Sequence, residues 1–198
     1  MNKKEEILDE AAKLFGKKGY AFALSELAEA VGIKTPSLYS HFKSKDNIVE
    51  LMLEREIRRF RGALEDFCSK MPDAGGRRRL EDLFRFVLEY MADMDGFWKG
   101  MVMIENTELR KKCLGMVLSQ NGWFTKVLEG AISEGIAEGD VSPDAGTGAI
   151  YLYYSTILGL TDIILLSKGT DFDMTEYANM TWAAYWNSIR SGREGKAS

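Results

Sequence analysis

A short basic segment, from Ile33 to Lys45, holds the side chains with the clearest chemistry in this chain of 198 residues. It contains three lysines, two aromatic residues and the only histidine, but no Asp or Glu, although the whole chain carries a formal net charge of −4. Lysine, hydroxyl and tyrosine side chains are the usual partners of nucleic-acid phosphates, which a carboxylate would repel. The segment therefore predicts a surface for DNA, with candidate contacts from Lys34, Thr35, Pro36, Ser37, Tyr39, His41, Lys43 and Lys45.

Patterns for catalysis or metal binding do not occur in the rest of the sequence. The single histidine lies inside the basic segment, and the two cysteines, Cys68 and Cys113, are too far apart in sequence for a metal-ligand motif. No glycine-rich phosphate loop is present. We therefore expect no catalytic residues, no metal and no cofactor. An enzyme that uses only Asp and Glu stays as a less favoured alternative.

Apolar residues at helical spacing surround the basic segment. Ala28 would let two short helices cross closely, and Gly32 would permit a positive φ in the turn between them. In such a helix–turn–helix unit, the second helix lies in the DNA major groove with its N-terminal residues toward the base edges. A helical hairpin that only exposes a basic face to solvent is the alternative. The helices expected here span residues 3–17, 26–31, 35–42 and 45–71, with Thr35 and Ser44 as N-caps.

The remaining sequence is also helical, so we expect an all-α protein. A Gly-rich break at residues 72–76 precedes further helices up to residue 190, with one uncertain boundary near Asn106. Residues 149–166 reach the length of a short membrane span, but they contain Asp162 and several hydroxyl groups, which favours a buried helix. The acidic N-terminus does not match a secretory signal. We therefore expect a soluble cytoplasmic protein with no membrane partner.

The stretch ALSELAEAVGIKTPSLYSHFKSKDNIVELM strongly resembles the DNA-binding domain of the TetR family of bacterial transcriptional regulators. Ala23 departs from the family pattern, which often has a helix-capping Thr there, and Ser25 is another candidate cap. Lys34, Thr35 and Pro36 also replace the family's commoner residues, so no operator sequence can be carried over from a relative. The matching residues are Phe15, Gly19, Tyr20, Leu27, Ala28, Gly32, Ile33, Leu38, Tyr39, His41, Phe42, Lys45, Asp46 and Ile48.

The resemblance implies two domains. A helix–turn–helix DNA-binding domain would span residues 1–46, and a larger helical bundle for ligand binding and dimerisation would span residues 47–198. Candidates for an apolar ligand pocket, with ordinary core as the alternative, are Tyr90, Met94, Phe97, Trp98, Met101, Trp123, Tyr151 and Tyr154. Candidates for a dimer interface, with completion of the monomer core as the alternative, are Ala178, Trp182, Tyr185, Trp186 and Ile189.

The function implied by the resemblance is a ligand-responsive DNA-binding regulator, in the family's usual mode a repressor. A homodimer would bind a palindromic operator, because a helix–turn–helix usually reads two half-sites about 34 Å apart. An unknown small molecule in the C-terminal domain would release the DNA. The alternative is a helix–turn–helix protein with a role in protein interaction or DNA architecture.

Overall fold

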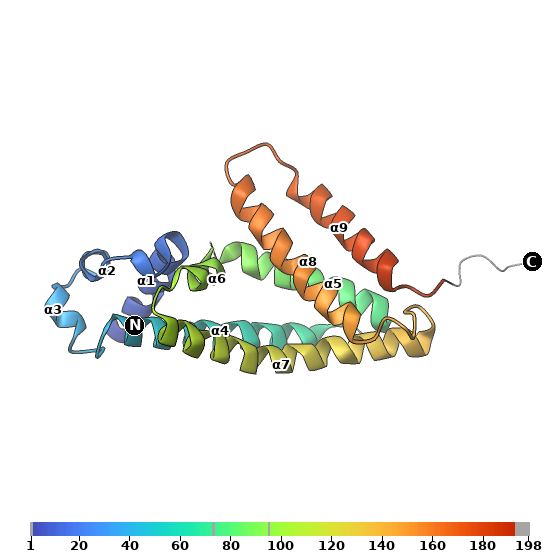
Figure 1. The fold of residues 1–198 in the computed structure, drawn as a ribbon, viewed down its shortest axis with the longest axis horizontal. Helices are drawn as coiled ribbons and strands as arrows, with labels where there is room; N and C mark the ends of the chain where they lie inside the picture. Colours follow the sequence, from blue (N-terminus) through green and yellow to red (C-terminus); the bar gives the residue numbers. More distant parts are fainter. Residues whose placement is uncertain (1, 73, 95, 193–198) are drawn as a thin grey trace, which may run out of the picture. The chain divides into compact units, whose positions relative to one another are not determined.

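The computed structural model describes residues 2–72, 74–94 and 96–192 (Figure 1). The predicted all-α fold is confirmed, since no strand forms within these ranges and Val141 and Arg190 make only an isolated bridge. The elements are α1 (Lys3–Lys18), η1 (Gly19–Ala21), α2 (Leu24–Ala30), α3 (Thr35–Leu38), α4 (Lys45–Lys70), α5 (Gly75–Asp93), α6 (Phe97–Gly100), η2 (Met101–Met103), α7 (Thr107–Glu138), α8 (Gly146–Ser167) and α9 (Met174–Ile189).

Side-chain caps define where several helices begin. The Ser44 hydroxyl accepts a hydrogen bond from the Asn47 amide at 3.1 Å, as expected for the N-cap of α4. The Asn106 side chain accepts from the amides of Glu108 and Leu109 at 3.1 and 3.2 Å. The uncertain boundary near Asn106 is therefore the start of α7.

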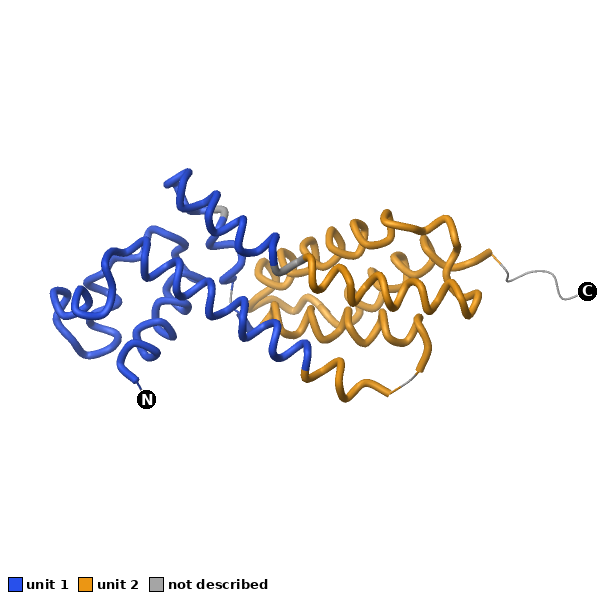
Figure 2. The backbone as a smooth tube through the Cα atoms, turned by 90° about the horizontal axis from the view of Figure 1, so that it is seen from below, with its two compact units in different colours: residues 1–65, 93–121 blue, residues 66–92, 122–198 orange. Residues whose placement is uncertain are grey.

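The chain divides into two compact units (Figure 2). The first unit comprises Met1–Glu65 and Asp93–Asn121, and the second unit comprises Asp66–Ala92 and Gly122–Ser198. The boundaries between the units fall inside α4, before the last residue of α5 and inside α7, rather than after Asp46. The expected domains, residues 1–46 and 47–198, are parts that would fold or act independently. This division stays a prediction.

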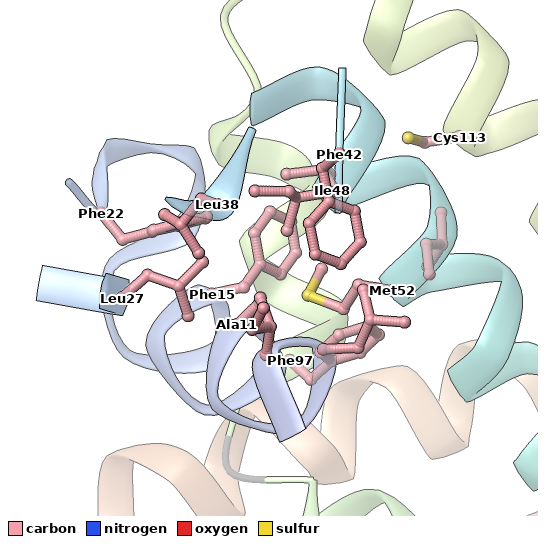
Figure 3. Close-up of a cluster of buried hydrophobic side chains, with 14 of the residues drawn as sticks. Ala11, Phe15, Phe22, Leu27, Leu38, Phe42, Ile48, Met52, Phe97 and Cys113 are labelled. Carbon is pink, nitrogen blue, oxygen red and sulfur yellow. The ribbon is translucent and has the colours of Figure 1, made fainter. Parts of the chain in front are cut away.

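The core of the first unit joins the helix–turn–helix segment to later parts of the chain (Figure 3). Phe15 of α1 and Leu38 of α3 are each 1% exposed, and they belong to the same buried cluster as Phe97 of α6. Cys113 of α7 also lies in this cluster, and burial raises the pKa of its thiol to about 11. Residues far apart in sequence therefore hold the helix–turn–helix segment in place.

A glycine allows α6 to approach α1 closely within the first unit. A Cβ atom added at Gly100 would lie 2.6 Å from a ring carbon of Phe15, which is closer than real Cβ contacts. The ring of Phe15 also packs against that of Phe97, with centroids 5.5 Å apart. A larger residue at position 100 would push the two helices apart.

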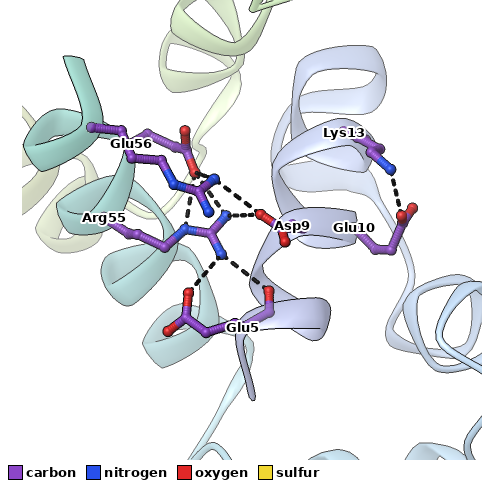
Figure 4. Close-up of polar contacts among 7 residues, drawn as sticks. Glu5, Asp9, Glu10, Lys13, Arg55 and Glu56 are labelled. Atoms are coloured by element: carbon purple, nitrogen blue, oxygen red, sulfur yellow. Dashed lines mark hydrogen bonds and ion pairs between the residues drawn. The ribbon is translucent and has the colours of Figure 1, made fainter. Parts of the chain in front are cut away.

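A buried ion network fixes α1 against α4 in the same unit (Figure 4). The guanidinium of Arg55 lies 2.7 Å from a carboxylate oxygen of Glu56, 3.0 Å from Asp9 and 3.3 Å from Glu5. Arg59 shares both Asp9 and Glu56, at 2.9 and 3.0 Å. The side chains of Arg55 and Glu56 are only 7% and 5% exposed, so each needs the other as a counter-charge.

The second unit has an aromatic core built from α5, α7, α8 and α9. The ring of Phe84 lies 5.3 Å from that of Trp182 and 6.0 Å from that of Tyr153. The backbones of α5 and α7 touch, because a Cβ atom at Gly76 would lie 2.3 Å from the amide nitrogen of Gly135. These contacts build a core within the second unit.

The face of α9 that the sequence offered as a dimer interface lies in this core. Trp182, Tyr185, Trp186 and Ile189 are buried, and Ala178 is half-buried. They complete the core of a single chain, which was the alternative reading, because aromatic rings from the chain's own helices cover them. A role of these residues in a dimer interface stays a prediction.

Only one face of α8 is covered by the chain itself. Tyr153, Ile157 and Leu160 are buried, whereas Tyr151 and Leu158 are 71% and 65% exposed. The expectation of burial on more than one side therefore holds for one side only within a single chain. This helix is long and apolar enough to cross a membrane by length and composition, and 28% of its apolar window is buried.

Candidate nucleic-acid interface

The turn between α2 and α3 is built as a helix–turn–helix requires. Gly32 has a φ of 68°, a conformation that glycine adopts without strain. The amide of Ile33 then donates to the carbonyl of Ala28 at 2.9 Å, which closes the turn. Leu27 and Leu38 are buried on either side of it. The positive φ at Gly32 and the apolar contacts match the roles that the sequence predicts for them.

Ala23 occupies the N-cap position of α2. Ser25 lies within the helix, so it is not the cap. An alanine side chain has no acceptor, but the Glu26 carboxylate accepts a hydrogen bond from the Ala23 amide at 2.9 Å. Lys18 pairs with the same carboxylate. The missing capping Thr is thus partly replaced by Glu26, whose charge is neutralised by a neighbour.

The predicted reading segment, residues 34–43, contains a single α-helical turn followed by tighter turns. Lys34 occupies the N-cap position of α3, one residue earlier than the predicted cap, Thr35. Pro36 lies in the first turn of the helix. After Leu38 the chain continues through turns, in which the amide of His41 donates to the carbonyl of Leu38 at 3.0 Å. Phe42 is buried and anchors the end of this segment.

Six of the eight predicted DNA contacts have exposed side chains. Tyr39, for example, is 57% exposed. Thr35 is half-buried. Lys34 and Lys43 form no ion pair with any residue that the structure describes, so their charges are free to meet an anion. The exposed six are Lys34, Pro36, Ser37, Tyr39, His41 and Lys43.

Lys45 is placed differently. Its ammonium group donates to the carbonyl oxygen of Tyr20 at 2.5 Å and lies 4.2 Å from the centre of the Tyr20 ring. Burial lowers the pKa of Lys45, partly offset by the neighbouring Asp46 carboxylate. The Tyr20 hydroxyl donates to Asp46, which also accepts from Asn106 at 3.2 Å. These contacts direct Lys45 toward its own chain. They also engage the carboxylate of Asp46, the first carboxylate after the basic segment.

This N-terminal architecture coincides with a known family. Residues 7–52 match the family described as bacterial regulatory proteins, tetR family. This N-terminal part belongs to the TetR family. The matched range includes the helix–turn–helix, the six exposed side chains and the start of α4.

Two curated regulators of the HTH type match part of this chain. The repressor ComR of Escherichia coli K12 is 42% identical over 66 residues, which are 32% of this chain and 31% of ComR. IcaR of Staphylococcus aureus strain Newman, the negative transcriptional regulator of the biofilm operon icaADBC, is 30% identical over 109 residues, 52% of this chain and 54% of IcaR. The chain thus spans about a third to a half of the length of these relatives.

A solved structure shares the fold along most of the chain. AibR, determined in complex with isovaleryl coenzyme A and operator DNA, superimposes with a TM-score of 0.72 at 18% sequence identity. The match covers 92% of this chain and 97% of AibR. At this identity the similarity shows a shared fold that extends beyond the helix–turn–helix.

The eight residues predicted to line a ligand pocket are divided between the two units of this chain. Phe97 is buried in the core of the first unit, where Met94, Trp98 and Met101 pack against it. In the second unit, Tyr154 bonds to Thr125 at 3.1 Å, while Tyr151 is largely exposed. Tyr90 packs near Phe86, and Trp123 is half-buried. A pocket formed by these residues stays a prediction.

The second unit contains two open grooves that the sequence did not indicate. One, of about 310 Å³, lies where the rings of Phe67 and Phe86 stack at 4.5 Å, and Lys70 and Arg85 also line it. The other, of about 400 Å³, is an apolar groove near the turn between α8 and α9. Its lining residues are Ile163, Leu166, Ser167, Thr170, Phe172 and Tyr177. Among the described residues, no group of three or more His, Cys, Asp and Glu could hold a metal ion.

Proposed function

We propose that this protein is a cytoplasmic transcriptional repressor, which binds operator DNA through the segment from Lys34 to Lys43. The observation that carries the proposal is the pair of exposed lysines, Lys34 and Lys43, which no carboxylate of the described chain neutralises. They flank the start and the end of the reading segment, where phosphate contacts would fix its register on the duplex. ComR and IcaR, which are named as a repressor and a negative regulator, support repression.

The DNA-binding form would be a homodimer. A single helix–turn–helix reads a short half-site, and a two-fold dimer reads two half-sites about one helical turn apart. Apolar side chains on the outer face of α8 and α9 support this part of the proposal, because a monomer rarely exposes so many large ones together. The residues are Tyr151, Leu152, Leu158 and Leu166 on α8 and Tyr177 and Met180 on α9.

A small molecule bound to the second unit would release the DNA. AibR, of similar fold, was determined with isovaleryl coenzyme A and with operator DNA, which supports regulation by a small molecule. An effector changes DNA affinity only if it binds the free and the DNA-bound forms with different affinities. The effector of this chain would therefore favour the form that does not bind the operator.

Genome-wide selection of bound DNA fragments tests the proposal. The purified full chain should enrich a short palindrome and bind it at least about 1,000-fold more tightly than bulk DNA. The variant Lys34→Ala/Lys43→Ala should lose most of this affinity, whereas Lys126→Ala, which removes an exposed lysine from α7 in the second unit, should retain it.

Two results would contradict the proposal. Absence of any enriched sequence would favour a role in protein interaction or DNA architecture. Retention of full affinity by the double variant would show that the DNA-binding surface does not include Lys34 and Lys43. Circular dichroism of each variant would confirm that the helices are intact.

A further inference from the structure

Two buried tyrosines in the second unit carry hydroxyl groups that have no hydrogen-bond partner among the described residues. Tyr153 of α8 is 1% exposed and Tyr185 of α9 is 3% exposed. Their rings pack edge to face with centroids 5.5 Å apart. A buried hydroxyl without a partner destabilises the fold, because it loses its bonds to water and gains none. Phenylalanine would fill the same space without this loss. A bound molecule that accepts their hydrogen bonds would explain why the two hydroxyls are present.

The surroundings of these hydroxyls are aromatic and uncharged. Burial raises the pKa of Tyr153 well above its usual value, and Tyr185, Tyr154 and Cys68 raise it further. The three tyrosines all have raised pKa values, so they stay protonated at neutral pH. Phe84 and Trp182 pack against Tyr153 and Tyr185 respectively. A charged guest would find no counter-charge here, and burial of an unpaired charge is strongly unfavourable.

The two phenols offer two hydroxyl groups from neighbouring rings. The neighbouring Tyr185 contributes to the raised pKa of Tyr153, yet the two hydroxyls do not hydrogen-bond to one another. Both groups stay protonated at neutral pH and are therefore donors. The neighbouring Tyr154 differs, because its hydroxyl already bonds to Thr125.

We propose that Tyr153 and Tyr185 are the polar recognition point for the effector, and that the effector is a small, uncharged, mainly apolar molecule whose carbonyl oxygen accepts a hydrogen bond from both hydroxyls. This inference rests on the proposed effector-binding role of the second unit. It adds the chemical class of the ligand and the two residues that select it.

Three matched probes test the ligand class without DNA. Acetophenone is uncharged and has one carbonyl, ethylbenzene has the same skeleton without the oxygen, and benzoate carries a charge. Acetophenone should raise the melting temperature of the full chain saturably and quench the fluorescence of Trp182, which packs against Tyr185. Ethylbenzene should bind about tenfold more weakly or worse, as expected for lost hydrogen bonds. Benzoate should not bind.

Two conservative variants test the residues. Tyr153→Phe and Tyr185→Phe should each leave the melting temperature of the free protein unchanged or higher, and each should weaken acetophenone binding by about tenfold. Tyr154→Phe is the matched stability control, since it removes a hydroxyl that has a partner and should lower the melting temperature.

Three outcomes would overturn the inference. The first is a fall in melting temperature for Tyr153→Phe or Tyr185→Phe equal to that of Tyr154→Phe, which would mean that buried water already satisfies the hydroxyls. The others are equal binding of ethylbenzene and acetophenone, and the absence of a saturable shift with acetophenone. Because these measurements use no DNA, their failure is distinguishable from failure of operator binding.

Discussion

The ammonium group of Lys45 lies 2.5 Å from the carbonyl oxygen of Tyr20, and thus joins the first residue of α4 to the turn after α1. The rings of Tyr20 and Phe22 face the same charge at 4.2 and 4.6 Å. A lysine in this position stabilises the contact between α4 and the turn after α1, which lie on either side of the reading segment in sequence. Lys43, two residues earlier, is exposed and forms no ion pair with the described residues.

The first prediction separates these two lysines by the salt dependence of DNA binding. Lys43→Ala should reduce the slope of log affinity against log salt by about one, because one phosphate contact is lost. Lys45→Ala should leave the slope unchanged and lower the free energy of unfolding by about 1–2 kcal/mol, because it removes a charged hydrogen bond. Fluorescence anisotropy with the selected operator measures the slopes. A reduced slope for Lys45→Ala would support the phosphate contact expected from the sequence.

The second prediction concerns the buried ion network. Arg55→Ala should lower the free energy of unfolding by about 3–5 kcal/mol, since Glu56 would lose its main counter-charge in a buried position. The double variant Arg55→Met/Glu56→Leu should lose less than Arg55→Ala alone. Arg58→Ala is the control, because its pair with Glu54 is exposed and should contribute less than about 1 kcal/mol. Urea unfolding measures all three, and similar losses for Arg55→Ala and Arg58→Ala would contradict the network.

The third prediction tests the close approach of α6 and α1. Gly100→Ala should destabilise the protein by about 1–3 kcal/mol, because the new methyl group would overlap the Phe15 ring. Gly115→Ala in α7 is the matched control: its Cβ would meet open space, and the gain in helix propensity should stabilise by up to about 1 kcal/mol. Thermal unfolding gives the sign of each change. Stabilisation by both substitutions would show that α6 does not pack tightly on α1.

The fourth prediction tests the outer face of α8 and α9. Leu158→Glu/Met180→Glu should convert the proposed dimer to a monomer, because carboxylates would be buried in an apolar interface. Sedimentation velocity measures the assembly state. Lys126→Glu is the control, since it adds one carboxylate to an exposed position of α7 and should leave the dimer intact. A dimer that survives the double substitution would place the interface elsewhere.

Features set by local sequence were predictable. The spacing of Ile7, Ala11 and Phe15 predicts α1, and Ser44 predicts the start of α4, because both depend on residues within one or two turns. Gly32 predicts the turn for the same reason. The shift of the α3 cap from Thr35 to Lys34 is a one-residue error of the kind that weakly defined helix ends produce.

Features set by distant contacts were not predictable. The pattern of α9 shows that Trp182 and Tyr185 share an apolar face, but it does not show whether the same chain or a second copy covers that face. The position of Lys45 in the basic segment likewise does not reveal that its ammonium group turns toward Tyr20. Phe97 lies more than 50 positions from most of the helix–turn–helix, so its place in the first unit's core depends on the fold as a whole.

The start of α3 has an evolutionary consequence. Lys34, Pro36 and Ser37 are exposed, while Leu38 and Phe42 secure the segment from beneath. Substitutions at these three positions therefore alter the outward chemistry of the segment without disturbing the side chains that hold it. Related proteins could therefore come to recognise a different operator through a few substitutions that leave folding unaffected. A library randomised at Lys34 and Ser37 would yield regulators with new operator preferences.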